Sequence, residues 1–162
     1  MISIVGGLNL FRKIGEKRLT YTEIKGDLFS VSEDYYLAHC ISADFVMGAG
    51  IAPQFTKHFG TKYDLMRKYP EYIKSFDDSD CIKIGRVFNL ITKKFVYQKP
   101  TYDSLLGALM KMYRICKREE ITKLAMPKIG CGIDGLDWEK VSKLIKIVFE
   151  DLDIDIKIYY LE

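Results

Sequence analysis

The sequence predicts an α/β fold, in which helices cover the faces of a largely parallel or mixed sheet. Three observations lead to this prediction. Short apolar runs typical of strands alternate with segments of helical period along most of the 162 residues. Loops that contain glycine follow several of these runs, as they do at the ligand-binding edge of α/β sheets. Neither a linker nor an internal repeat interrupts the pattern, so we expect one compact domain.

The first third of the chain is expected to contain strands and one helix. Residues 1–5 are apolar and predict an edge strand that ends at two glycines. Residues 19–24 alternate and are rich in threonine and tyrosine, which favours a strand. Residues 36–41 form an apolar run typical of a buried strand. A helix is expected to open at the glycine-rich residues 47–51 and to extend to Phe59, because the proline between them is tolerated in a first turn.

The middle of the chain adds a helix, a loop and a strand. Residues 62–72 predict a short helix that Pro70 interrupts. Residues 75–80 are acidic and polar, which is typical of a surface loop. Residues 86–92 are rich in Val, Phe, Leu and Ile and predict a strand that delivers Lys93 at its C-terminal end.

The last third is expected to alternate helix, strand, helix and strand. Apolar residues recur with helical period from residue 105 to residue 116, and again from Trp138 to Leu152. Residues 121–125 form a short apolar run that predicts a buried strand, and residues 154–161 alternate in the manner of a strand.

The composition of the sequence indicates which kinds of ligand the protein can bind and where in the cell it is expected. The formal net charge is +3 and the basic residues are scattered, which indicates no nucleic-acid track but suits a phosphate-bearing ligand. The four cysteines lack metal-knuckle spacing and the two histidines lie far apart, so we expect no metal site. The sequence has neither a secretory signal nor an apolar run long enough for a bilayer. We therefore expect no membrane association and a location in the cytoplasm, or in the nucleus of a eukaryotic host. We also expect a monomer.

One stretch stands out as a candidate binding loop. Residues 126–138, MPKIGCGIDGLDW, lie between a predicted strand and a predicted helix and contain three glycines and Asp134. Glycine lets a ligand approach the backbone, and N–H groups at a helix start can hold an anion. Three other strand-end loops carry distinctive residues, namely Gly26-Asp27, residues 47–51 and Lys93-Lys94. Two glycine loops can hold a diphosphate, while a lysine can act as a nucleophile and an aspartate can transfer its proton.

Each of these features also has a purely structural interpretation. The glycine loops can be turns before helices, and Asp27 can cap a turn. His39 lies in an apolar run, which favours a hydrogen-bonded core histidine over a catalytic base. A single surface lysine such as Lys93 seldom acts in catalysis. Taken one at a time, the residues leave a ligand site and a set of ordinary turns both open.

The order of the motifs resembles the macrodomain family, in the subclass of terminal ADP-ribose protein glycohydrolases. The resemblance runs from about Thr20 to Leu161. It divides the chain into an N-terminal extension or edge strand, residues 1–19, and a macrodomain, residues 20–162. It rests on six motifs: KGDLF at 25–29, AHCIS at 38–42, MGAGIA at 47–52, LITKK at 90–94, KPTY at 99–102 and MPKIGCGIDGLDW at 126–138.

The resemblance implies a three-layer α/β/α sandwich with a mixed central sheet and a cleft for ADP-ribose across its top. Lys93 and Asp134 match the catalytic lysine and aspartate of the family. Asp27 matches the residue that contacts the adenine amino group. The other positions that we predict to bind the ligand are Leu28, Ser42, Met47, Gly48, Ala49, Gly50, Ile51, Pro127, Ile129, Gly130, Cys131, Gly132 and Ile133.

The implied activity is that of a hydrolase that releases mono-ADP-ribose from ester-linked glutamate or aspartate of modified proteins. In the implied mechanism Lys93 attacks C1″ of the distal ribose to form a lysyl-ADP-ribose intermediate, Asp134 assists, and no metal or other cofactor is required. The resemblance makes O-acetyl-ADP-ribose a further candidate substrate. Two alternatives stay open: a reader module that binds ADP-ribose without turnover, and a glycohydrolase that acts on ADP-ribosylated thymidine in DNA.

Overall fold

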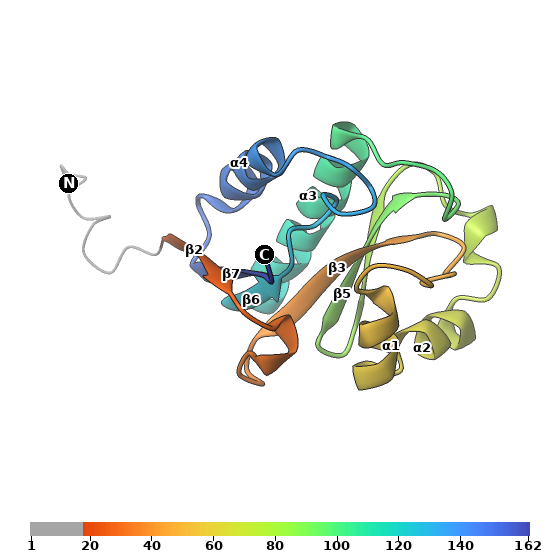
Figure 1. Cartoon of the computed structure of the whole chain (residues 1–162), viewed down its shortest axis with the longest axis horizontal. Helices are drawn as coiled ribbons and strands as arrows, with labels where there is room; N and C mark the ends of the chain where they lie inside the picture. The colour runs from red at the N-terminus through yellow and green to blue at the C-terminus, as the bar shows by residue number, and fades with distance from the viewer. Residues whose placement is uncertain (1–17) are drawn as a thin grey trace.

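The computed structural model describes residues 18–162 and contains a six-stranded mixed sheet (Figure 1). The strand order is β2-β7-β6-β3-β5-β4. Neighbouring strands are parallel, except that β4 pairs antiparallel with β5 at one edge. The strands are β2 (Leu19–Lys25), β3 (Tyr36–Ser42), β4 (Asp80–Ile84), β5 (Val87–Lys93), β6 (Lys123–Met126) and β7 (Ile154–Tyr160).

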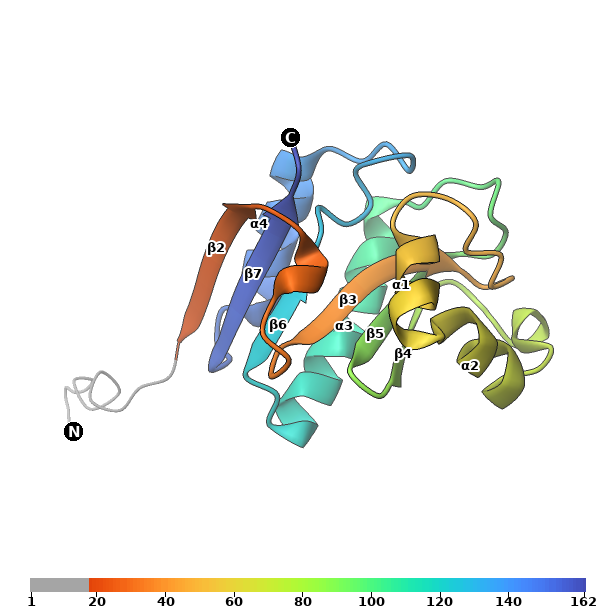
Figure 2. The same ribbon diagram turned by 60° about the horizontal axis from the view of Figure 1, so that its bottom comes forward.

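Two pairs of helices cover the two faces of the sheet. Figure 2 shows α1 and α2 in front of the sheet and α3 and α4 behind it. The first pair contacts β3 and β4, whereas the second pair packs together and against β5 and β2. This is the three-layer α/β/α sandwich that the family resemblance implied. The helices are α1 (Ala52–Phe59), α2 (Thr61–Lys68), α3 (Tyr102–Glu119) and α4 (Trp138–Phe149), with 3₁₀ turns η2 (Leu28–Ser30) and η3 (Tyr72–Lys74).

The start of the long helix α3 is fixed by local sequence. The Ser104 N–H donates to the Thr101 hydroxyl, and the Thr101 N–H donates to the Ser104 hydroxyl, each over 3.0 Å. This reciprocal cap satisfies two backbone donors that would otherwise lack partners at a helix start. None of the helices within residues 18–162 is long and apolar enough to span a membrane.

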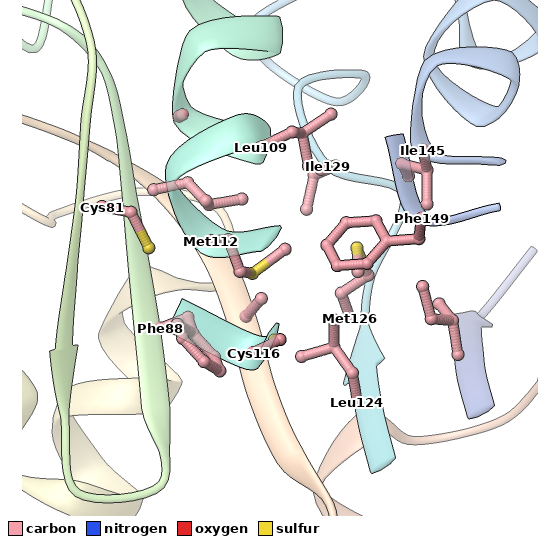
Figure 3. Close-up of a cluster of buried hydrophobic side chains, with 14 of the residues drawn as sticks. Cys81, Phe88, Leu109, Met112, Cys116, Leu124, Met126, Ile129, Ile145 and Phe149 are labelled. Carbon is pink, nitrogen blue, oxygen red and sulfur yellow. The ribbon is translucent and has the colours of Figure 1, made fainter. Parts of the chain in front are cut away.

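The main core lies between the sheet and the helices α3 and α4 (Figure 3). Leu109 and Met112 of α3, Phe149 of α4 and Leu124 of β6 are fully buried there. Burial of a side chain of this size stabilises a fold by about 1.5–3 kcal/mol. The helical period that predicted α3 and α4 from the sequence is the period of this buried face.

His39 on β3 is buried beside α1, on the other face of the sheet. Its ring stacks on that of Phe55 with centroids 3.8 Å apart, and its Nε2 atom lies 2.7 Å from Oδ1 of Asn89. Burial lowers the pKa of His39 to about 4, so the ring is neutral at physiological pH. This is the core histidine that the sequence favoured over a catalytic base.

The structure differs from the sequence predictions chiefly at β4. The sequence predicts a polar loop up to Asp80 and no strand after it, but Asp80 begins β4. Gly85, at φ +57°, lets the chain reverse so that β4 pairs with β5 as a hairpin. The predicted strand from residue 121 begins instead at Lys123. The edge strand predicted for residues 1–5 lies outside the described residues.

Candidate active site

A cleft of about 270 Å³ lies at the C-terminal ends of β3, β5 and β6. Parallel strands bring these ends to one edge of the sheet, where the loops that follow them converge. Both glycine-rich loops found in the sequence, and the end of β5, contribute to its walls. The lining residues are Cys40, Ile41, Ser42, Met47, Gly48, Ala49, Gly50, Ile51, Ala52, Lys93, Val96, Pro127, Lys128, Ile129, Gly130, Gly132, Ile133 and Asp134.

Lys93 and Asp134 meet in this cleft. The Lys93 ammonium donates a hydrogen bond to Oδ1 of Asp134 over 2.7 Å. Their side chains are 11% and 16% exposed, so the pair is largely shielded from water yet open to the cleft. Charges placed this close in a shielded site interact more strongly than an exposed pair.

The backbone of Lys93 is held from two sides. Lys93 is the last residue of β5, and its carbonyl accepts a hydrogen bond from the Ala43 N–H over 2.9 Å. The carbonyl of the preceding residue, Thr92, accepts a hydrogen bond from the Ser104 hydroxyl of α3 over 2.7 Å. The lysine therefore extends from a fixed point at the edge of the sheet.

Asp134 lies in the loop between β6 and α4, where glycines shape the turn. Gly130 and Gly135 have φ values of +73° and +79°, which residues with a Cβ rarely adopt. The Leu136 N–H donates to the carbonyl of Gly130 over 2.9 Å and closes the loop. A Cβ atom on Gly130 would lie 3.1 Å from Leu136 Cδ1, so the loop is also tightly packed at this point.

The other glycine loop, residues 47–51, leads into α1 on the opposite wall of the cleft. Met47 and Gly50 have φ values of +49° and +64°. Ile51 stands at the N-terminal end of α1, and its carbonyl accepts a hydrogen bond from the Phe55 N–H. A helix start preceded by such a loop is a suitable place for a phosphate group. The two loops lead into helices on opposite faces of the sheet, and residues of both line the cleft (Figure 2).

Asp44 organises this side of the cleft, although the sequence analysis did not single it out. Its Oδ1 accepts hydrogen bonds from the Ser42 hydroxyl over 2.6 Å and from the Val46 N–H over 3.2 Å. Its Oδ2 accepts one from the Val96 N–H over 2.9 Å. One carboxylate thus joins the loop after β3 to the loop after β5. An acidic residue two positions after a strand-end serine is the signal that could have indicated it.

Three predicted ligand residues lie outside the wall of the cleft. Oδ1 of Asp27 accepts a hydrogen bond from the Phe29 N–H over 3.0 Å and caps η2, which is the structural role also considered for it. Leu28 is buried. The Cys131 thiol donates to the Ile129 carbonyl within its own loop. The contacts that we predicted for these three residues stay predictions.

The cysteines near the pair are poor nucleophiles. Burial raises the pKa of the Cys40 thiol well above its ordinary value, and burial also raises that of Cys131 to about 11. Both thiols are therefore protonated at neutral pH, and a thiolate is the reactive form of cysteine. Lys93 and Ser42 both line the cleft with a carboxylate at hydrogen-bonding distance, Asp134 for the amine and Asp44 for the hydroxyl. The Asp44 carboxylate also accepts two backbone N–H groups, whereas Asp134 lines the cleft beside the amine, which favours Lys93 as the nucleophile.

Comparisons with known proteins agree on one family. The family model described as "Macro domain" matches residues 38–145. "ADP-ribose glycohydrolase OARD1" of Homo sapiens is 46% identical over 145 residues, which cover 89% of this chain and 92% of that protein. The Bos taurus protein of the same name is 45% identical over the same shares. "DNA ADP-ribosyl glycohydrolase" of Mycobacterium tuberculosis is 29% identical, over 83% of this chain and 40% of that protein.

Solved structures share the fold. The "Macrodomain of Thermus aquaticus DarG" superposes with a TM-score of 0.74 at 22% identity, covering 88% of this chain and 99% of that one. The "Macrodomain of Mycobacterium tuberculosis DarG" gives a TM-score of 0.71 at 26% identity, covering 87% and 96%. The likeness extends over nearly all of the described sheet and helices.

Proposed function

The chain belongs to the macro domain family, and on this premise we propose that it is an ADP-ribose glycohydrolase. Its substrates in this proposal are proteins that carry mono-ADP-ribose on glutamate or aspartate through an ester bond. Two relatives that carry the name ADP-ribose glycohydrolase share 45–46% of their residues with nearly the whole chain. The observation that carries the mechanism is the hydrogen-bonded pair of Lys93 and Asp134 inside the cleft.

In the proposed reaction, Asp134 first takes a proton from the ammonium of Lys93. The neutral amine attacks C1″ of the distal ribose, an N–C1″ bond forms, and the C1″–O bond to the target side chain breaks. The target leaves as a carboxylate, which is a good leaving group. Water then adds to C1″ and loses a proton to the solvent, the N–C1″ bond breaks, Asp134 returns its proton to the amine, and free ADP-ribose departs. Asp134 is suited to both proton transfers because its carboxylate lies within hydrogen-bonding distance of the amine.

The proposed ligand position follows from the two glycine loops. The backbone of residues 47–51 and that of residues 129–133 would hold the diphosphate from opposite sides, with the distal ribose above Lys93. Adenine would extend from there toward the ends of β2 and β7. Asp27 lies at that end of the same sheet edge, which supports its proposed contact with the adenine amino group.

Chemical trapping tests this proposal. The N–C1″ adduct can open to an imine, which borohydride reduces to a stable amine. We therefore expect borohydride added during turnover of an ADP-ribosylated glutamate peptide to leave one ADP-ribose-derived adduct, and mass spectrometry to place it on Lys93. Lys143→Ala, which removes an exposed lysine on α4, should trap as the wild type does. Tight binding of ADP-ribose without release of the peptide would instead identify a reader module.

A second candidate function is removal of ADP-ribose from DNA, and one surface feature favours it. The rings of Phe95 and Tyr97 stack with centroids 5.4 Å apart, and Tyr97 is 76% exposed. They flank Val96, which lines the cleft, and the Lys94 ammonium lies 5.7 Å from the Phe95 ring centroid. An exposed aromatic surface beside a cation can stack a base of single-stranded DNA.

Parallel substrates separate the two functions. The wild type should be offered ADP-ribosylated thymidine DNA and ADP-ribosylated glutamate peptide at equal concentrations, and we expect a higher kcat/KM for the peptide. A preference for DNA that Tyr97→Ser abolishes would make DNA the principal substrate. Tyr97→Ser should leave peptide turnover unchanged, because Tyr97 does not line the cleft.

A further inference from the structure

The KPTY segment, residues 99–102, was one of the six sequence motifs, and the proposed chemistry gives it no role. It lies between the end of β5 and the first turn of α3. We propose that Lys99 and Tyr102 are positioning residues that hold the Asp134 loop in register with Lys93. This inference rests on the proposed function, because the two residues would act only through the reacting pair.

Two hydrogen bonds join this segment to the Asp134 loop, one on each side of Asp134. The Lys99 ammonium donates to the carbonyl of Ile133, the residue immediately before Asp134, over 2.6 Å. The N–H of Asp137 donates to the Tyr102 hydroxyl over 3.0 Å. The backbone that carries Asp134 is therefore held at two points by one short segment.

The same segment is anchored to the strand that carries Lys93. The Ser104 hydroxyl donates to the carbonyl of Thr92, the residue immediately before Lys93, over 2.7 Å. Ser104 and Thr101 also cap α3 reciprocally, which fixes the first turn of the helix. Residues 99–104 are thus hydrogen-bonded both to the backbone beside Lys93 and to the backbone beside Asp134. Movement of Lys93 relative to Asp134 would break these hydrogen bonds.

The Asp134 loop needs such support because its own hydrogen bonds are short-range. The Gly135 N–H donates to the Gly132 carbonyl and the Leu136 N–H to the Gly130 carbonyl, bonds that set the shape of the loop but not its position over β5. Within residues 18–162, the hydrogen bonds that join residues 130–137 to segments outside the loop and α4 come from Lys93, Lys99 and Tyr102. The bond to Lys93 must itself rearrange during the reaction. Lys99 and Tyr102 then supply the remaining hydrogen bonds that hold the loop, beside the packing of Cys131 and Leu136 against the core.

Substitution of each positioning residue should lower turnover more than binding. A misplacement of reacting groups by about 1 Å can lower a rate as much as ~10²-fold, so we expect Lys99→Met and Tyr102→Phe each to lower kcat roughly tenfold. The Kd for ADP-ribose should change by less than about threefold, since neither side chain lines the cleft. Lys99→Arg, which keeps a donor of similar reach, should restore most of the lost kcat. Lys143→Met, an exposed lysine on α4, is the matched control.

A second measurement does not depend on turnover. A double-mutant cycle at Lys93 and Asp134, measured by the free energy of unfolding, gives the coupling energy between the two side chains. This coupling energy should fall by about half or more when the cycle is repeated in the Lys99→Met background. Normal kcat together with unchanged coupling in Lys99→Met would overturn the inference. Failure of the wild type to hydrolyse any ADP-ribosylated substrate would overturn the proposed function instead, while loss of coupling would still establish Lys99 as a positioning residue.

Discussion

The Lys93 ammonium and the Asp134 carboxylate are 2.7 Å apart in space and 41 residues apart in the chain. Lys93 ends β5 and Asp134 lies in the loop after β6, and in the sheet these two strands flank β3. The two side chains therefore reach toward each other across the end of β3, whose residues Cys40 and Ser42 line the same cleft. The order of the strands thus places a nucleophile and a proton acceptor at one point of the cleft.

Lys93→Ala should abolish turnover while leaving the cleft intact. Without the amine no covalent intermediate can form, and we expect kcat/KM for an ADP-ribosylated glutamate peptide to fall by about 10³-fold or more. Calorimetric titration should show that the affinity for ADP-ribose changes only a few-fold, because the glycine loops remain. Residual turnover within tenfold of the wild type would assign the chemistry to another group.

The pair should also contribute to folding stability. Its side chains are only 11% and 16% exposed, so removal of one partner leaves a shielded charge without its counter-ion. A double-mutant cycle with Lys93→Met and Asp134→Asn, measured by urea denaturation, should give a coupling of roughly 1–3 kcal/mol. Simple additivity of the two substitutions would mean that the pair is not formed in solution.

Replacement of Gly60 by alanine should lower stability alone, whereas replacement of Gly130 should lower both stability and ADP-ribose binding. Gly60 separates α1 from α2 at φ +67°, with open space around it, and Gly60→Ala should cost about 1 kcal/mol of stability without changing turnover. Gly130 combines φ +73° with a tight contact to Leu136, so Gly130→Ala should cost roughly 2 kcal/mol and weaken ADP-ribose binding. Equal effects of the two variants on binding would contradict the assignment of Gly130 to the ligand site.

His39 should make the protein less stable as the pH falls from 7 to 5. Burial lowers its pKa to about 4 in the folded state, whereas an exposed histidine in the unfolded chain titrates near its ordinary value of 6.5. In this range the unfolded state therefore binds more protons, and the free energy of unfolding should fall by about 2 kcal/mol. Urea denaturation at several pH values checks this slope.

His39→Gln provides the control for that slope. Glutamine keeps a side-chain amide that can bond Asn89 but does not titrate, so most of the loss between pH 7 and pH 5 should vanish. Asp34, whose pKa the Lys123 ammonium lowers to about 2, stays charged throughout this range. The same pH dependence in His39→Gln as in the wild type would assign the effect to another group.

Sequence periodicity predicted most of the fold because the spacing of apolar residues follows the faces that each element buries. The strands β3 and β5 are nearly continuous apolar runs since both of their faces are covered, and α3 and α4 each carry one apolar stripe. The strand β4 was missed because its five residues, with an aspartate at the first and a lysine at the fourth, form too short a pattern beside a polar loop. Its pairing depends on the turn at Gly85, a single glycine that no flanking strand pattern marked as a hairpin turn.

The site was only partly predictable for a different reason. The family resemblance joined Lys93 to Asp134, whereas local patterns alone did not, because their contact depends on the order of strands in the sheet. Asp44 escaped notice because its role is to join two loops that are distant in the chain. For Asp27, by contrast, the local pattern was sufficient: the capping role considered for it is present in the structure, while its ligand contact stays a prediction.

The position of β7 in the sheet has a consequence for biosynthesis. The edge strand β2 pairs with β7, with Leu19 opposite Ile154, so a strand made early must wait for one made much later. While the ribosome is still translating the intervening residues, β2 has no partner and exposes unsatisfied backbone donors and acceptors. Nascent chains arrested before residue 154 should therefore engage chaperones and resist folding, although the residues that form the cleft have already been made.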